Sequence, residues 1–195
     1  MNKKGGLHTM SVLFTRRGKP PTKFNPQLEL NSWDRIAEAS ITGIAESLWS
    51  VGDVKKVVLN GTVGLYTFSN IEIYVQILGF NHNKSVELNE NHIVFGFCKM
   101  TADGNDICLV DSNNGSTSTS GFIMNTSGTN SGGWGNSYMR NTICSAFENA
   151  LPAELRNVLR SRTLYTNNYS AGGSNNDAAI TTTTDKVYIA SEFEV

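Results

Sequence analysis

The chain has 195 residues, of which 39% are hydrophobic and 17% charged, with a formal net charge of −1. This length suffices for one domain with a sizeable core, and the low charge content means that uncharged polar residues must provide solubility. No stretch approaches the ~20 apolar residues of a membrane span, and the apolar segment 10–14 is too short for a signal-peptide core. We therefore expect neither a membrane span nor a signal peptide.

Residues 1–27 are predicted to form a basic extended arm, because glycines and prolines interrupt regular structure there. Residues 1–23 carry six of the 16 basic residues and no acid, so 24–195 hold ten basic and 17 acidic residues, a charge of −7. Such an arm suits an acidic neighbouring subunit, an anionic surface or nucleic acid, unless it is a solvated tail. We favour an acidic subunit over nucleic acid, with contacts through Arg16, Arg17, Lys19 and Lys23.

Residues 28–195 are predicted to form a single α+β domain. Its first helix is expected to follow Ser32, whose side chain can cap the first turn, and to place Trp33 and Ile36 on one side. Gly43 interrupts this helix, and a second short helical turn is expected before residues 51–53.

From residue 54 the pattern becomes that of β-strands. Asn60-Gly61 lies between the apolar runs 54–59 and 62–67 and is a preferred pair for a two-residue hairpin turn, because both positions need positive φ. A longer strand is predicted over 71–80, with Ile73 and Val75 on its inner face. A second hairpin is predicted over 93–99 and 107–110. The acidic residues at its turn lack the spaced carboxylates of a calcium loop, so we interpret them as turn residues.

The three cysteines are Cys98, Cys108 and Cys144, and no Cys-x-x-Cys pair occurs. A two-residue turn at 103–104 would place Cys98 and Cys108 on opposite faces of the hairpin. Free thiols are therefore expected rather than a disulfide framework. The three histidines show no metal-binding spacing, and we expect neither a metal nor a cofactor.

Residues 112–136 are almost entirely Ser, Thr, Asn and Gly, and no charge occurs between Asp111 and Arg140. This composition is typical of a flexible linker. The apolar run 122–124 in its middle instead predicts a long surface loop that is pinned to the body.

The stretch 132–141 ends this loop and begins the best helical pattern of the chain. Asn136 or Ser137 can cap that helix, and Trp134 can pack back on its first turn. We interpret Trp134, Ser137, Tyr138 and Arg140 as a structural motif that anchors the core; the other interpretation is a ligand site at Trp134 or Tyr138.

The last part of the chain is predicted to contain a helix that starts at Leu151-Pro152, a strand at 162–166, a polar loop at 167–184 and a final strand at 186–190. Because nothing follows that strand, we expect an oligomer that completes the sheet, although a self-contained variant or a fragment of a longer protein is also compatible. The predicted core is Trp33, Ile36, Trp49, Val58, Ile73, Val75, Ile77, Phe95, Phe97, Leu109, Trp134, Ile143, Phe147, Leu155 and Ile189.

No catalytic motif is visible: the chain lacks a Gly-x-Ser-x-Gly elbow, a phosphate-binding glycine loop and a His-Glu-x-x-His helix. It does contain a Trp-x-x-Ser-x-Met-Arg helix start at 134–140, a Leu-Pro helix at 151–152 and Thr-Asp-Lys-Val-Tyr-Ile-Ala-Ser at 184–191. These motifs resemble an uncharacterised bacterial and phage domain family that is distantly similar to formylglycine-generating enzymes and the C-type-lectin-like fold. The segments 10–21, 49–53 and 77–83 are similar to prophage tail-region proteins.

The resemblance implies a C-type-lectin-like domain with antiparallel hairpins, a few short helices and long irregular loops. Members of that family usually continue past the equivalent of 186–190, so this domain is expected to be incomplete at its C-terminal end. None of the three cysteines reproduces the reactive motif of the formylglycine-generating branch, so that activity is not transferred.

We expect a phage or prophage virion component of the tail or host-attachment apparatus, found in the virion or in the bacterial cytoplasm during assembly. It would bind other virion subunits and possible host glycans or proteins, and no catalytic residue is assigned. The alternative is an oxidase or hydrolase on the same fold. Ligand contacts are expected on the loops 112–131 and 165–176, at Asn125, Asn130, Tyr165, Asn167 and Tyr169.

Overall fold

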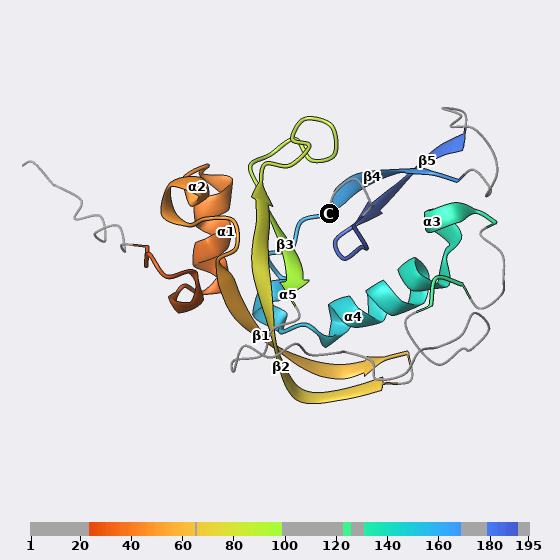
Figure 1. The fold of residues 1–195 in the computed structure, drawn as a ribbon, viewed down its shortest axis with the longest axis horizontal. Helices are drawn as coiled ribbons and strands as arrows, with labels where there is room; N and C mark the ends of the chain where they lie inside the picture. Colours follow the sequence, from red (N-terminus) through yellow and green to blue (C-terminus); the bar gives the residue numbers. More distant parts are fainter. Residues whose placement is uncertain (1–23, 65, 99–122, 126–130, 169–178, 191–195) are drawn as a thin grey trace, which may run out of the picture.

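The computed structural model describes residues 24–64, 66–98, 123–125, 131–168 and 179–190. It contains two antiparallel sheets and several short helices, which confirms the α+β class (Figure 1). The helices are η1 (Leu28–Leu30, 3₁₀), α1 (Trp33–Ile41), α2 (Ala45–Leu48), α3 (Gly133–Asn136), η2 (Met139–Cys144, π), α4 (Ser145–Ala150) and α5 (Ala153–Arg156). The strands are β1 (Val54–Val63), β2 (Tyr66–Phe80), β3 (Ile93–Cys98), β4 (Arg162–Asn167) and β5 (Ile180–Asp185).

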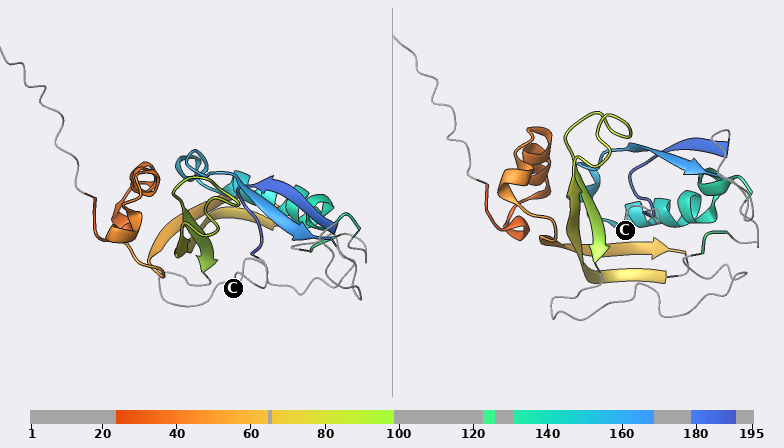
Figure 2. Two further views of the ribbon diagram at one scale, coloured as in Figure 1. Left: turned by 90° about the horizontal axis from the view of Figure 1, so that it is seen from above. Right: turned by 45° about the horizontal axis from the view of Figure 1, so that its top comes forward.

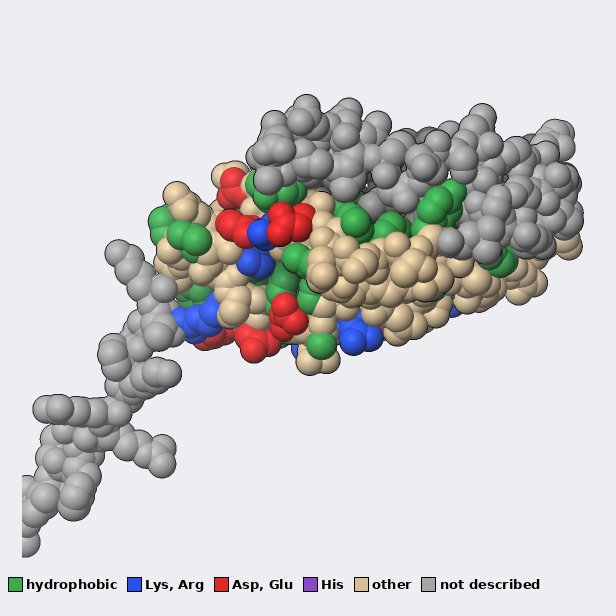
Figure 3. Space-filling view, turned by 90° about the horizontal axis from the view of Figure 1, so that it is seen from below, with side chains coloured by type: hydrophobic (Ala, Val, Ile, Leu, Met, Phe, Trp, Pro, Cys, Tyr) green, Lys and Arg blue, Asp and Glu red, His purple; other side chains and the backbone are tan. Residues whose placement is uncertain are grey.

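The elements are spread along one long axis. Both views of Figure 2 place α1 and α2 at one end and the β4–β5 hairpin with α3 at the other. The sheet β1-β2-β3 runs between them, and α4 packs against β1. On the face shown in Figure 3, charged side chains gather toward the α1–α2 end, and the surface toward the other end is mostly uncharged.

The first helix forms as its capping signal predicts. The Ser32 hydroxyl accepts a hydrogen bond from the Arg35 amide, and Trp33, Ile36 and Ala39 are buried. Gly43 ends the helix with a φ of 76°, a left-handed conformation that glycine adopts without a steric penalty.

The junction between the predicted arm and the domain is also described. Phe24 packs edge-on against the Trp49 ring, and the Trp49 Nε1–H donates to the Asn25 carbonyl. Residues 24–27 of the predicted arm therefore contact the body. Arg16, Arg17, Lys19 and Lys23 lie outside the described residues.

The predicted turn at Asn60-Gly61 is wrong. β1 continues through both residues, and its Cα pairing with β2 closes at Val63 and Tyr66; Leu59 pairs with Ile71 but Gly61 pairs with Phe68, so this pair forms a bulge. The strands extend past the bulge because doing so buries Val63 and Phe68. Positive φ at Gly61, 136°, serves the bulge rather than a turn.

Gly61 gives a direct test of this bulge. A β-carbon there would meet Ala150 at 3.5 Å, an ordinary contact, so the cost of Gly61→Ala is backbone strain alone. We expect a destabilisation of about 1–3 kcal/mol. Gly79→Ala, where a β-carbon meets nothing within 4 Å and φ is not left-handed, is the matched control and should cost clearly less. Urea unfolding measures both, and equal losses would contradict this account of the bulge.

The inner face of the three-stranded sheet is set by the pairing of β2. Ile73, Val75 and Ile77 are buried there as predicted, and their partners on β1 share that face. Val57 pairs with Ile73, so Val57 is buried and the predicted core residue Val58 is half-buried on the opposite face.

The core joins this sheet to the helices. The buried residues that predictions named correctly are Trp33, Ile36, Trp49, Ile73, Val75, Ile77, Ile143, Phe147 and Leu155. Phe95 and Trp134 pack against the core but are half-buried, whereas Phe97 and Ile189 are exposed. Phe97 lies near the end of β3, where its ring contacts Phe147 edge-on. Leu109 and the predicted strand 107–110 lie outside the described residues.

The predicted final strand at 186–190 is also wrong. The strand that pairs with β4 is β5, Ile180–Asp185, which the sequence interpretation assigned to a polar loop. Its threonines are β-branched and suit a half-exposed strand, while residues 186–190 follow it without strand pairing. Val187 packs against the core and Ile189 points outward.

Within the described ranges, no helix combines the length and apolar character needed to cross a membrane.

Candidate functional site

Two side chains of the motif at 134–140 donate hydrogen bonds to the carboxylate of Asp185, which lies much later in the chain. Asp185 Oδ1 accepts from Arg140 Nε at 2.8 Å, and Asp185 Oδ2 accepts from the Trp134 indole at 3.0 Å. Thr183 Oγ1 donates to the same Oδ2 at 2.6 Å. The side chains of Arg140 and Asp185 are 24% and 9% exposed, so this ion pair is largely withdrawn from water. It joins the start of the main helix to the end of β5.

Of the two predicted caps, Asn136 and Ser137, it is Ser137 that caps the start of the helix. The Ser137 hydroxyl donates to the Trp134 carbonyl and accepts from the Arg140 amide. Ser137 is 1% exposed. The first six residues of the helix, Met139–Cys144, are a π-helix, a rare element that continues directly into α4. These contacts hold the start of the helix in place.

Cys144 lies beside this ion pair, and its pKa is raised to about 11, first by burial and then by the charge of Asp185, against a smaller opposing effect of Arg140. A thiol is a weak nucleophile, because the thiolate is the reactive form. Cys144 is therefore poorly suited to catalysis at neutral pH.

This shift predicts how Cys144 reacts with iodoacetamide. In the folded protein the thiolate should appear only as the pH approaches about 11, so alkylation at neutral pH should be much slower than in urea. Because the folded pKa lies above the ordinary value, the associated stability is present below the unfolded pKa and is lost as pH rises through about 11. Mass spectrometry of the Cys144 peptide measures the rate, and equal rates in folded and unfolded protein contradict the burial.

A cavity of about 450 Å³ lies on the other side of Trp134. We call it the Tyr165 cavity; its walls come from the loop after β2, from β4 and from the segment after β5. Its lining combines aromatic, polar and aliphatic side chains: His82, Asn83, Glu87, Met124, Trp134, Leu164, Tyr165, Thr166, Tyr188, Ile189 and Ala190.

Two of these walls are fastened together by Arg162. This buried guanidinium pairs with the Glu87 carboxylate and donates to the Tyr188 hydroxyl. The Thr163 amide donates to the Glu87 carbonyl at 2.9 Å, which adds a backbone link between β4 and the loop. These contacts with Arg162 fix the positions of Glu87 and Tyr188.

The loop between β2 and β3 has an unusual backbone. Asn81, Asn83 and Ser85 have positive φ, between 51° and 75°, a conformation uncommon outside glycine. The two ring nitrogens of His92 each lie 2.9 Å from a backbone carbonyl, those of Glu90 and His82, and so tie both ends of the loop together. Strained backbone held by such contacts is typical of ligand sites.

One hydroxyl in the wall of the Tyr165 cavity makes no hydrogen bond to the described residues. Thr166 Oγ1 is buried, and among the described residues it has no hydrogen-bond partner. A buried donor without a partner costs about 1–3 kcal/mol, which a ligand with a matching polar group can recover. The Thr166 hydroxyl is therefore a buried, unsatisfied group in the wall of the cavity.

Of the predicted ligand residues that the structure describes, Tyr165 alone lines this cavity, and its side chain is exposed. Asn167 is exposed on β4 but does not line the cavity, and the Asn125 side chain accepts from the Tyr138 amide, a local structural role. Asn130 and Tyr169 lie outside the described residues. Sequence reasoning missed Asn83, Glu87, Thr166 and Tyr188; the Asn-His-Asn run at 81–83 was the visible signal.

Among the described residues, no group of three or more His, Cys, Asp or Glu side chains is placed to hold a metal ion. The three calcium-like turn residues near 103–106 lie outside those residues. Comparison with protein-family models, with curated proteins and with solved structures finds no significant match for this chain.

Proposed function

We propose that this protein is a phage or prophage virion component, in the tail or host-attachment apparatus, that acts by binding a saccharide in the Tyr165 cavity. The observation that carries the proposal is the make-up of that cavity: three aromatic side chains stand beside Asn83, Glu87 and the buried Thr166 hydroxyl. A sugar ring has apolar C–H faces and polar hydroxyl edges. Aromatic side chains supply rigid contact area, and amide, carboxylate and hydroxyl groups supply hydrogen bonds.

The fixed walls of the cavity support a binding role. Arg162 holds Glu87 and Tyr188 in place before any ligand arrives, so little conformational entropy is lost on binding. The buried thiol of Cys144, in contrast, gives no support to an oxidase that uses that residue.

The C-type-lectin-like relationship belongs to the same proposal. Its support is spatial: Trp134 and Arg140 of one resemblance motif bond directly to Asp185 of the other. The two motifs therefore act as one structural unit, as motifs retained together within one domain would.

A glycan array probed with the full-length protein tests the saccharide proposal. The wild-type protein is expected to bind at least one bacterial surface glycan, and Tyr165→Ala to weaken that binding by roughly tenfold, since one aromatic contact contributes about 1–2 kcal/mol. Tyr74→Ala is the matched control, because Tyr74 lies on β2 away from the cavity. No hits with wild type, or equal losses in both variants, would overturn the proposal.

The virion assignment is tested separately through the basic arm. Removing 1–23, which ends before the Phe24–Trp49 contact, is expected to leave the body folded and to release it from purified particles. A truncated protein that still copurifies with particles contradicts the assembly role of Arg16, Arg17, Lys19 and Lys23. Failure of the wild-type protein to copurify contradicts the virion assignment itself.

A further inference from the structure

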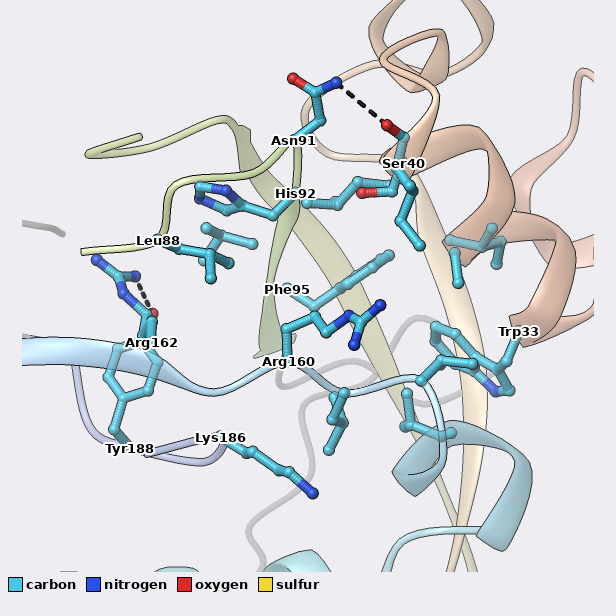
Figure 4. A pocket seen from close by; sticks show the side chains of 18 residues that line it. Trp33, Ser40, Leu88, Asn91, His92, Phe95, Arg160, Arg162, Lys186 and Tyr188 are labelled. Atoms are coloured by element: carbon cyan, nitrogen blue, oxygen red, sulfur yellow. Dashed lines mark hydrogen bonds between the residues drawn. The ribbon is translucent and has the colours of Figure 1, made fainter. Parts of the chain in front are cut away.

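A second pocket shares the lining residue Tyr188 with the Tyr165 cavity. It encloses about 160 Å³ between α1, β3, the end of α5, the start of β4 and the segment after β5 (Figure 4). A larger cavity of about 510 Å³ adjoins it, and the two share the walls made by Trp33, Phe95, Leu155, Leu159, Lys186 and Tyr188. We call the smaller cavity the Arg160 pocket and the larger one its apolar extension.

The walls of the Arg160 pocket differ sharply in character. Trp33, Ile36 and Phe95 form an apolar side. Leu155 on α5 and Leu159 after it continue this side into the extension. Among the described residues, the ionisable side chains that line the pocket are Arg160, Arg162, Lys186, His92 and Tyr188, and none of the described lining residues is a carboxylate. One side is therefore apolar and the other is cationic.

The carboxylates that pair with these cations are not among the residues that line the pocket. Glu87 engages Arg162 in a buried pair, which fixes that guanidinium. His92 is also committed, because both its ring nitrogens contact backbone carbonyls. Lys186 Nζ lies 3.2 Å from Glu148 Oε1, and Figure 4 shows its ammonium directed away from the pocket centre.

Arg160 is different. Its Nε lies 3.5 Å from Glu90 Oε1, and the two side chains are 58% and 39% exposed, so their pairing is weak and screened by water. Figure 4 shows the Arg160 guanidinium pointing into the pocket between Phe95 and Trp33. A guanidinium presents a fork of N–H donors that matches a carboxylate, and here that fork sits above apolar walls.

From this arrangement we propose a second ligand site, for an amphipathic anion: a carboxylate on an unbranched alkyl chain. The carboxylate lies on the Arg160 guanidinium, and the chain runs along Trp33 and Phe95 into the extension bounded by Leu155 and Leu159. Burial of the chain provides affinity, and the cationic wall selects the sign of the head group. This site shares the lining residues His82, Tyr188 and Ala190 with the Tyr165 cavity, but it does not depend on the saccharide proposal.

Isothermal titration calorimetry of the full-length protein with sodium octanoate tests this site, with octylammonium chloride as the matched ligand of opposite charge. Octanoate is expected to bind saturably and octylammonium not to bind. Arg160→Gln should weaken octanoate roughly tenfold, as expected for one charge-assisted hydrogen bond, and Arg160→Lys should recover part of the loss. Lys56→Gln, which removes an exposed cation outside both cavities, should leave the affinity unchanged.

Three results would overturn the site: no saturable binding of octanoate at millimolar concentrations, equal binding of octanoate and octylammonium, or an unchanged affinity in Arg160→Gln. Arg160 is exposed, so its substitution is not expected to unfold the protein, and circular dichroism of each variant checks this.

Discussion

Asp185→Ala is expected to destabilise the protein by about 3 kcal/mol, one of the two largest effects that the structure predicts. The substitution leaves the Arg140 guanidinium without its carboxylate and removes the acceptor of the Trp134 indole. The Arg140 side chain is 24% exposed and Trp134 is half-buried, so solvent replaces the lost oxygen atoms only in part. Urea unfolding monitored by circular dichroism measures the loss.

The control for Asp185→Ala is Glu72→Ala. Glu72 also pairs with a cation, Lys56, but at an exposed position where the side chains are 38% and 51% accessible. Its removal should cost no more than about 1 kcal/mol. A double variant, Arg140→Met with Asp185→Leu, should recover part of the Asp185→Ala loss, because no uncompensated charge remains. Equal costs for the two single variants would show that the pair at 140 and 185 is not a buried tie.

Phe147→Ala is expected to cost about 3–5 kcal/mol, because it leaves a cavity in the core. Phe147 is buried on α4, which packs against β1, and its ring meets Phe97 edge-on with centroids 4.7 Å apart. The measurement is the free energy of unfolding in urea.

Leu30→Ala is the matched control for this prediction. Leu30 is a large apolar residue at a surface position, and its truncation should change stability by no more than about 0.5 kcal/mol. A loss below about 1 kcal/mol in Phe147→Ala would contradict the packing of α4 against the sheet.

Local signals in the sequence predicted the elements whose cause is local. Ser32 caps α1 through its own side chain, and Pro152 accepts the first-turn hydrogen bonds of α5 from Leu155 and Arg156. Asn60-Gly61 misled because a glycine with positive φ suits a bulge as well as a turn. The choice between a bulge and a turn depends on whether Val63 and Phe68 can be buried in the core. That depends on tertiary packing and not on the local sequence.

The same distinction explains the error at the end of the described chain. Residues 186–190 have the more apolar pattern, but β4 pairs with the threonine-rich segment 180–185. That register leaves Asp185 opposite Arg162 at the end of the hairpin, where its carboxylate meets Arg140 and Trp134. Strand propensity along one segment carries no information about that distant partner.

The candidate site could be predicted only in part for a related reason. Tyr165 was identified as a ligand residue and lines the cavity, but the other walls come from the loop after β2 and from the segment after β5. Glu87 and Tyr188 are 101 positions apart in the sequence and meet through Arg162. Their juxtaposition is a product of the fold and leaves no spacing signature in the sequence.

The most direct test of the central claim, saccharide binding in the Tyr165 cavity, is a titration of ¹⁵N-tryptophan-labelled protein with a bacterial surface glycan. The chain has three tryptophans, so three indole signals are expected. Trp134 lines the cavity, and Trp49, buried beneath Phe24, is an internal control. We predict that the Trp134 signal shifts saturably with added glycan while the Trp49 signal stays in place. An unchanged Trp134 signal, with every glycan that the host surface provides, would contradict the claim.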